Sequence, residues 1–360
     1  MIRNIILNFL KTASKIKERE VKAVVFSFLF VVILMSAYYI LRPVRDAMAS
    51  DWTDAEVSWL WTLNFFISTV IVALYGIMVS KFRFRLLVPA MYGIFAGSFI
   101  IFYVLGSIYA DQILIDKAFY VWVSVFSLFH ISVFWSFMSE LFSKEQSSRL
   151  FGIIAVGASV GGLIGPSITA FFSVSLGTDK LMLIASIMLL IPIPIIFYLQ
   201  SLKTKELNNE VLSTPISNQS IGGNPLAGFK MFFSNPYLLS IGLFIFLYTG
   251  ISSFVYFELK NLLSDFTRPE RSVIWAQMDL AVNILAISTG LFATGRIVTK
   301  FGMPTTIAMV PIMICIGLLV LAISPLLGVV MILQIVRRAG NYAVTRPARE
   351  MLFTLVNQET

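Results

Sequence analysis

Two pairs of arginines in this sequence lie at the edge of long apolar segments or inside them, where charged side chains are costly. Arg42 and Arg45 follow nineteen residues without a charge, and Asp46 stands directly after them. On a helix, Tyr38, Arg42 and Arg45 or Asp46 share one face. Guanidinium groups bind phosphate and carboxylate oxygens through two parallel hydrogen bonds. This spacing indicates an anion site, or alternatively two side chains that reach the headgroups at a membrane surface.

The second pair, Arg337 and Arg338, lies eleven residues into the last apolar run, which starts at Leu326. At 1.5 Å per residue this is roughly 17 Å into an apolar core of about 30 Å. An arginine at that depth costs about 2.5–3.5 kcal/mol, so we expect at least one of the two to face a polar cavity. Further polar residues continue along the same helical face, namely Asn341 or Tyr342, Thr345 and Arg349.

Single titratable groups inside other apolar runs are weaker signals. Lys260 closes the seventh run, and Asp279 in the eighth is a candidate counter-charge to the arginines or a coupling-ion site. His130 is the only histidine and Cys315 the only cysteine, so we expect no metal site and no intrachain disulfide. The sequence has no phosphate-binding glycine loop followed by lysine and no nucleophile–base pair. We therefore expect a protein that is not an enzyme and needs no cofactor.

The elements that position these residues are predicted to be membrane-spanning helices. Hydrophobic residues make up 58% of the chain and charged residues 13%, and the mean hydropathy is +0.87, which is typical of a protein in lipid. The net charge is +8, and the positively charged residues lie between the apolar runs. Membrane topology therefore explains this charge better than nucleic-acid binding does. Ten candidate helices follow from the apolar runs, at 23–41, 57–79, 86–109, 118–142, 151–174, 181–199, 237–257, 273–297, 305–323 and from 326 onward.

Composition also divides the chain. Residues 1–22 form a basic amphipathic segment, 23–199 a six-helix half, 200–235 a polar cytoplasmic linker, and 236–360 a half with four helices. With the N-terminus in the cytoplasm, twenty of the 27 lysines and arginines fall on the inner side, as the positive-inside rule requires. We expect a multi-pass protein of the inner membrane with a cytoplasmic N-terminus.

An internal repeat predicts the fold. GIMVSKFR at Gly76–Arg83 and GRIVTKFG at Gly295–Gly302 share four of eight residues at an offset of 219. Two parallel six-helix halves follow from this match, and the octets resemble the loop motif of the major facilitator superfamily. The expected fold is an all-α, major-facilitator-like bundle with ten of twelve transmembrane helices present. Small residues in the fifth helix allow close helix approach or contribute to function, namely Gly157, Gly161, Gly162, Gly165 and Pro166.

The residues of both arginine pairs resemble the nucleotide (ATP/ADP) translocase family of bacteria and plastids. That family's first-helix motif matches Tyr38, Ile40, Leu41, Arg42, Arg45 and Asp46, and its tenth-helix motif aligns with NYAVTRPAREM at Asn341–Met351. Its seventh-helix lysine matches Lys260, and FWSFMSELFSKEQSSRLFG at Phe134–Gly152 resembles its fourth-to-fifth helix connection. Two family glutamates fall on Val123 and Tyr256, and Arg346 replaces an aspartate. A site with fewer acids and the same cations still suits an anion.

These observations predict a monomeric secondary transporter that moves a nucleotide or another organic phosphate across the bilayer by alternating access. The predicted substrate-binding residues are Tyr38, Arg42, Arg45, Asp46, Lys260, Asp279, Arg338, Asn341, Tyr342, Arg346 and Arg349. Two alternatives stay open. One is a proton-coupled exporter of small apolar compounds that uses Asp279, and the other is a membrane fragment or partner protein without transport activity.

Overall fold

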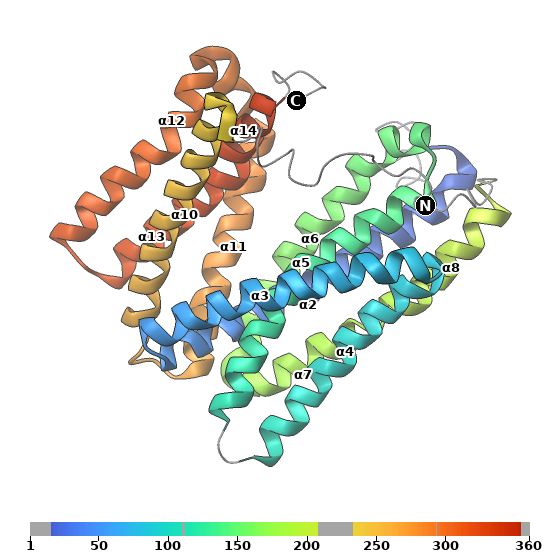
Figure 1. Ribbon diagram of the computed structural model, residues 1–360, viewed down its shortest axis with the longest axis horizontal. Coiled ribbons are helices and arrows are strands. Elements are labelled where there is room, and N and C mark those ends of the chain that lie inside the picture. The colour runs from blue at the N-terminus through green and yellow to red at the C-terminus, as the bar shows by residue number, and fades with distance from the viewer. Residues whose placement is uncertain (1–15, 110–111, 208–232, 293, 354–360) are drawn as a thin grey trace. The chain divides into compact units, whose positions relative to one another are not determined.

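Helices alone make up the regular structure of the described residues in the computed structural model (Figure 1). The structure describes residues 16–109, 112–207, 233–292 and 294–353. The chain forms two compact units. Unit 1 comprises Met1–Asn218 with Thr267–Gln277, and unit 2 comprises Gln219–Phe266 with Met278–Thr360.

Unit 1 contains seven long helices and the beginning of an eighth. In chain order its elements are η1 (Glu18–Glu20), α2 (Val21–Met48), η2 (Ala49–Asp51), α3 (Asp54–Lys81), α4 (Phe84–Ile108), α5 (Ile113–Leu141), α6 (Lys144–Leu176), α7 (Thr178–Met188), α8 (Pro192–Lys205) and the first residues of α11 (Arg268–Phe292).

Unit 2 contains the remainder of α11 and the helices on either side of it in sequence. These are α10 (Pro236–Leu262), α12 (Thr294–Ile323), α13 (Leu327–Gly340), the π-helical turn η4 (Asn341–Thr345) and α14 (Arg346–Phe353).

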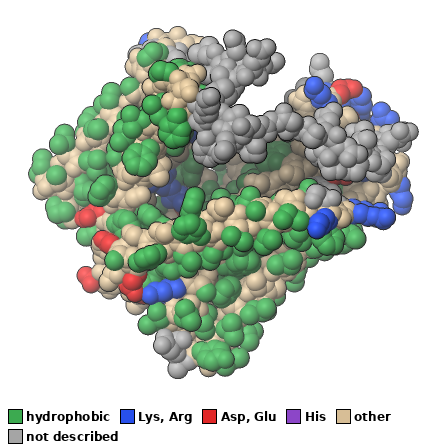
Figure 2. Space-filling model, viewed as in Figure 1, with side chains coloured by type: hydrophobic (Ala, Val, Ile, Leu, Met, Phe, Trp, Pro, Cys, Tyr) green, Lys and Arg blue, Asp and Glu red, His purple; other side chains and the backbone are tan. Residues whose placement is uncertain are grey.

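Nine helices in the described ranges are long and apolar enough to cross a membrane. They correspond to the first nine predicted runs, the sixth of which combines α7 and α8. The tenth run is helical from Leu327 to Phe353 but carries buried arginines within its span. Hydrophobic side chains cover much of the face shown in Figure 2. This pattern fits helices whose outward faces contact lipid rather than water.

The first apolar run was predicted to span residues 23–41, and Pro43 to kink or end its helix; α2 does not end there but continues through this proline to Met48. A proline removes one backbone hydrogen bond and disfavours helical geometry at the preceding residue. Packing compensates here, since Leu41 and Val44 on either side are completely buried. The longer helix carries Arg45 and Asp46 on the same rigid element as Tyr38.

Glycines of α6 allow this helix to pack directly against the backbone of α2. A Cβ atom at Gly161 would lie 2.5 Å from the carbonyl oxygen of Val32, and one at Gly165 would lie 2.5 Å from that of Ser36. Both distances are too short for any side chain. The packing interpretation of the small-residue spacing is therefore confirmed, and α6 holds α2 in place along the segment that leads to the arginines.

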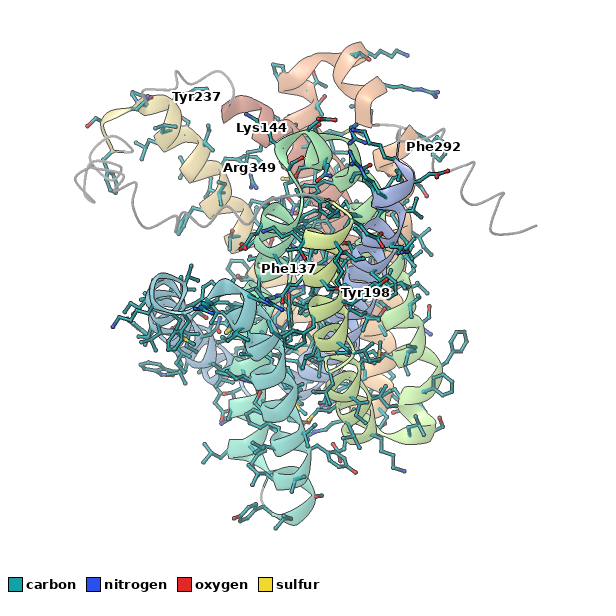
Figure 3. All side chains as sticks on the ribbon, turned by 90° about the vertical axis from the view of Figure 1, so that its right-hand side faces the viewer. Phe137, Lys144, Tyr198, Tyr237, Phe292 and Arg349 are labelled. Atoms are coloured by element: carbon teal, nitrogen blue, oxygen red, sulfur yellow. The ribbon has the colours of Figure 1, made fainter. Side chains whose placement is uncertain are left out.

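Aromatic side chains fill the interior of unit 1. The rings of Phe30 and Phe134 meet edge to face with centroids 5.0 Å apart, and Phe30 also contacts Phe137, which is buried. Figure 3 shows the side chains that fill the space between the helices of this unit, with Phe137 labelled. Edge-to-face pairs add about 0.5–1.5 kcal/mol beyond the area that they bury.

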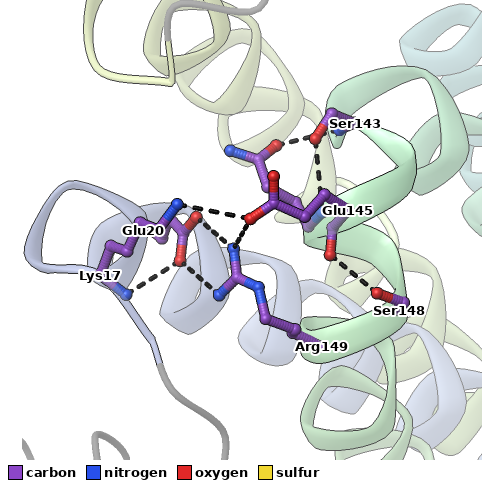
Figure 4. A network of polar contacts seen from close by, with 7 residues as sticks. Lys17, Glu20, Ser143, Glu145, Ser148 and Arg149 are labelled. Carbon is purple, nitrogen blue, oxygen red and sulfur yellow. Dashed lines mark hydrogen bonds and ion pairs between the residues drawn. The ribbon is translucent and has the colours of Figure 1, made fainter.

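Charged residues join the beginning of α2 to the beginning of α6 (Figure 4). The Arg149 guanidinium donates to both carboxylate oxygens of Glu20 at 3.2 and 3.0 Å, and Lys17 lies 3.4 Å from Glu145. Most of the predicted amphipathic segment 1–22 precedes these residues and lies outside the described ranges.

The two repeat octets both end where one helix gives way to the next, as predicted. Gly76–Arg83 covers the end of α3 and the turn into α4. In the second octet Gly302 has φ of 76°, a left-handed conformation that glycine adopts without strain. This residue is the non-helical point within α12. Residues 200–205 of the predicted linker are the last turns of α8.

Candidate functional site

Arg42 and Arg45 of unit 1 share the carboxylate of Asp46. Arg45 Nη2 lies 2.6 Å from Asp46 Oδ1, and Arg42 Nε lies 3.7 Å from Asp46 Oδ2. The aspartate is buried and both arginines are largely buried. The three side chains together carry one net positive charge. We name Arg42, Arg45 and Asp46 the first-helix cluster.

Helix α5 provides the polar surroundings of the first-helix cluster. Arg45 Nη1 donates to the Ser124 hydroxyl at 3.2 Å, and its guanidinium lies 5.4 Å from the centroid of the Tyr120 ring. A cation over an aromatic face is attracted by the ring quadrupole. On the same two helices, Tyr38 of α2 stacks on the buried ring of His130 of α5, with centroids 4.3 Å apart. The structure therefore brings Tyr38, Arg42, Arg45 and Asp46 together on one helix, as the sequence predicted.

A second ionic network of unit 1 was not predicted from the sequence. Arg268 Nε and Arg271 Nη1 each lie 2.6 Å from a carboxylate oxygen of Asp51, and Arg268 Nη2 lies 2.7 Å from Asp116. Arg271 also donates to the carbonyl oxygen of Ala47 at 3.3 Å. The network attaches the first turn of α11 to the end of α2 and the beginning of α5. Residues more than 200 positions apart have no local sequence pattern that pairs them.

Arg338 and Asp279 form a buried ion pair in unit 2. Arg338 Nη2 donates to Asp279 Oδ1, and both side chains are at most 5% exposed. Asn283, one turn after Asp279 on α11, donates its side-chain amide to the Asp279 carbonyl at 2.8 Å. The interpretation of Asp279 as a counter-charge to the arginine pair is confirmed by this contact.

Arg337 has a different environment from that of its neighbour. Its Nε and Nη2 atoms donate to the amide oxygen of Gln334 at 3.1 and 2.6 Å, and Nη1 donates to the Ser252 hydroxyl. The Tyr248 hydroxyl donates to the Arg337 carbonyl at 3.0 Å. The charged guanidinium is therefore surrounded by neutral oxygens of α10 and α13.

The other predicted residues of unit 2 differ in exposure. Lys260 is 2% exposed and donates to the Asn261 side chain at 2.8 Å. The π-helical turn η4 follows the arginine pair directly, and such turns are frequent at functional sites. Beyond it, Asn341 and Arg349 are half-buried, whereas Tyr342 and Arg346 are exposed.

Pro347 explains the position of the π-helical turn. It has no backbone N–H to donate to the carbonyl of Ala343, and its ring would clash with that carbonyl in a regular helix. The wider turn moves the carbonyl away and shifts the helical register by one residue. Arg338, Tyr342 and Arg349 were predicted to lie on one face of a regular helix. No pattern in the sequence indicates the π-helical turn that shifts them.

Each unit thus contains two adjacent or nearly adjacent arginines and one aspartate at their side. Such an arrangement suits an anion with two oxygens close together, because the planar guanidinium can donate to both. Among the described residues no group of three or more histidine, cysteine, aspartate or glutamate side chains could hold a metal ion. A single cavity lined by the predicted substrate-binding residues of both units remains a prediction.

Comparisons with known proteins agree with this description. The family described as Major Facilitator Superfamily matches residues 25–348. A bacterial homologue of the human lysosomal transporter Spinster, crystallised in an inward-facing, unoccupied conformation, is similar with a TM-score of 0.53 and 16% identity, over 94% of this chain and 76% of that one. Its inward-facing, occupied form gives a TM-score of 0.51 and 13% identity, over 94% and 78%. A search of the curated proteins finds no match.

Proposed function

The chain belongs to the major facilitator superfamily, and we propose that this membrane transporter moves an organic phosphate anion, with a nucleotide as the favoured substrate. The structural neighbours share its fold at low identity, so they carry no argument about substrate. The comparisons show the superfamily alone, and the resemblance to nucleotide translocases supports the finer proposal. The substrate class rests on the residues themselves.

One observation carries this proposal, namely the buried guanidinium of Arg337, which no carboxylate of the described residues contacts. Arg42 and Arg45 both pair with Asp46. In unit 2 Arg338 pairs with Asp279, while Arg337 is bonded to neutral oxygens. Uncompensated charges are expensive in a low-dielectric interior, so they are retained where a ligand of opposite charge completes the pairing. Phosphate provides that charge, and two of its oxygens can accept hydrogen bonds from the planar fork of one arginine.

The transport cycle that we propose is alternating access of two halves in the inner membrane, with the N-terminus in the cytoplasm. The excess of lysine and arginine in the segments assigned to the inner side supports this orientation. In this cycle the substrate's phosphate enters from one side, neutralises the arginines, and leaves on the other side after the halves have moved.

The alternative of a proton-coupled exporter would use Asp279 as the proton site. In the structure this carboxylate accepts a hydrogen bond from Arg338, so the two functions assign Asp279 different roles. Binding of phosphate-bearing compounds therefore separates the two functions.

The experiment that tests the proposal is a thermal-shift assay on the purified protein with ATP, ADP, adenosine and inorganic phosphate. We expect nucleotides to raise the melting temperature, since a ligand at 100 times its Kd stabilises the folded state by about 2.7 kcal/mol. Adenosine lacks the phosphates and should have no effect. A matched control is Arg296→Gln, which removes an exposed arginine and should leave the nucleotide response unchanged. Equal stabilisation by adenosine, or none by any nucleotide, would contradict the proposal.

A further inference from the structure

Arg337 and Arg338 are adjacent in sequence and equally buried, but the structure gives them different charge environments. The charge of Arg338 is matched by the Asp279 carboxylate. Arg337 is 8% exposed, and its guanidinium contacts Gln334, Ser252 and Tyr248 among the described residues, all of them neutral. A buried cation of this kind is costly unless another negative group reaches it.

Gln334 occupies the place that a carboxylate would take. It lies one turn before Arg337 on α13, is 2% exposed, and its single amide oxygen accepts from both Nε and Nη2. A carboxylate at this place could accept from the same two guanidinium nitrogens through its two oxygens. Glutamate has the same shape as glutamine and would neutralise the arginine within its own helix. Glutamine orients the guanidinium of Arg337 but, being neutral, does not balance its positive charge.

The Arg337 guanidinium has more N–H donors than its hydrogen bonds to Gln334 and Ser252 use. Arginine carries five N–H groups, and the hydrogen bonds to Gln334 and Ser252 use three of them. The Tyr248 hydroxyl interacts with the same guanidinium, and in the described part of the chain no carboxylate contacts the N–H groups that remain. Two N–H groups are the number that a bidentate contact with an oxyanion requires.

We propose that Arg337 is the residue that holds the substrate's oxyanion, with a terminal phosphate group as the ligand, and that Gln334 orients it without neutralising it. Ser252 and Tyr248 fix the guanidinium and the backbone of α13 from α10. Arg338, in contrast, is a positioning residue that joins α13 to α11 through Asp279. This inference rests on the proposed function and deepens it, because it assigns the phosphate to one of two neighbouring arginines.

The test is the substitution Gln334→Glu, which adds a carboxylate at the guanidinium without changing the size of the side chain. We expect the ligand-free protein in detergent to melt at a higher temperature, because the buried charge is now paired. The concentration of ATP or inorganic phosphate needed for a given rise in melting temperature should increase about tenfold or more. The reason is that the added carboxylate competes with the phosphate and repels it.

A matched control uses a second glutamine–arginine pair. Arg85 Nε donates to the Gln200 amide oxygen at 3.0 Å on an exposed part of unit 1. Gln200→Glu makes the same chemical change there and should leave both the melting temperature and the ATP response close to those of the wild type. Arg337→Lys, which keeps the charge but loses the planar fork, should also weaken ATP binding, and it serves if Gln334→Glu does not fold.

The outcomes separate this inference from the proposed function. If the wild type responds to ATP and both Gln334→Glu and Arg337→Lys respond equally well, the assignment to Arg337 is wrong and the proposed function stands. If the wild type responds to none of the phosphate compounds, both are wrong. An unchanged melting temperature of ligand-free Gln334→Glu would show that the charge of Arg337 is already compensated, and would overturn the assignment on its own.

Discussion

Arg338 and Asp279 lie 59 residues apart in sequence and meet inside unit 2, where Arg338 Nη2 donates to Asp279 Oδ1. The contact joins α13 to α11 and places a matched pair of charges beside the unmatched charge of Arg337. A buried ion pair of this kind does not by itself add much stability, but each partner depends on the other.

Single substitutions that remove one member of this pair should therefore be severe. Asp279→Asn or Arg338→Met leaves a buried charge without its partner, and we expect a loss of about 3–5 kcal/mol in the free energy of unfolding. The double variant removes both charges and should lose much less than the sum of the two. Thermal melting in detergent measures all three. Additive losses would mean that the two residues do not act as a pair.

The close approach of α2 and α6 predicts a second effect. Gly161→Ala places a Cβ atom 2.5 Å from the Val32 carbonyl oxygen and should lower stability by about 1–3 kcal/mol through overpacking. Gly152 lies on the same helix with no atom within 4 Å of its would-be Cβ. Gly152→Ala should therefore leave stability unchanged or raise it by about 0.5–1 kcal/mol, because alanine favours helix. Similar melting temperatures of the two variants would contradict the packing.

The ionic network of unit 1 predicts that Asp51 is important for stability. Both Arg268 and Arg271 bond to its carboxylate, so Asp51→Asn weakens two charged contacts at once. We expect a loss of about 1.5–3 kcal/mol, the range for hydrogen bonds to charged groups. Asp265→Asn, an exposed aspartate between α10 and α11, is the matched control and should have little effect. High salt should reduce the difference between the two variants.

Membrane orientation can be measured with single cysteines in a Cys315→Ala background. Phe82 and Asp265 are exposed residues in two interhelical turns that the topology places on opposite sides. Phe82→Cys should resist a membrane-impermeant thiol reagent in whole cells and react after the membrane is opened, whereas Asp265→Cys should react in both cases. The reverse pattern would show that the N-terminus lies outside the cytoplasm.

Much of the fold was predictable because lipid imposes strict requirements on a chain. Apolar runs of about twenty residues have few alternatives to helix in a bilayer, so nine of the predicted spans match helices in the described ranges. The glycine spacing of α6 likewise predicted close packing. The first span was predicted to end at residue 41, whereas α2 ends at Met48. Burial of the residues on both sides of Pro43 outweighs the tendency of proline to end a helix.

The candidate site was predictable in its residue types but not in its pairing. The depth of Arg337 and Arg338 identified them as unusual, and Asp279 was correctly chosen as a counter-charge. Sequence alone does not say which arginine takes the aspartate, because both are within reach on adjacent helical positions. The contact of Arg268 and Arg271 with Asp51 is formed by tertiary structure, and the π-helical turn depends on a local balance around Pro347 that periodicity does not show.

The most direct measurement of the central claim is exchange of labelled nucleotide across proteoliposomes that contain the purified protein. We predict uptake of labelled ATP or ADP that unlabelled nucleotides compete away, that adenosine and apolar cations leave unchanged, and that Gln334→Glu reduces strongly while Gln200→Glu does not. Uptake of apolar compounds driven by a proton gradient, with no competition by any phosphate-bearing compound, would contradict the account.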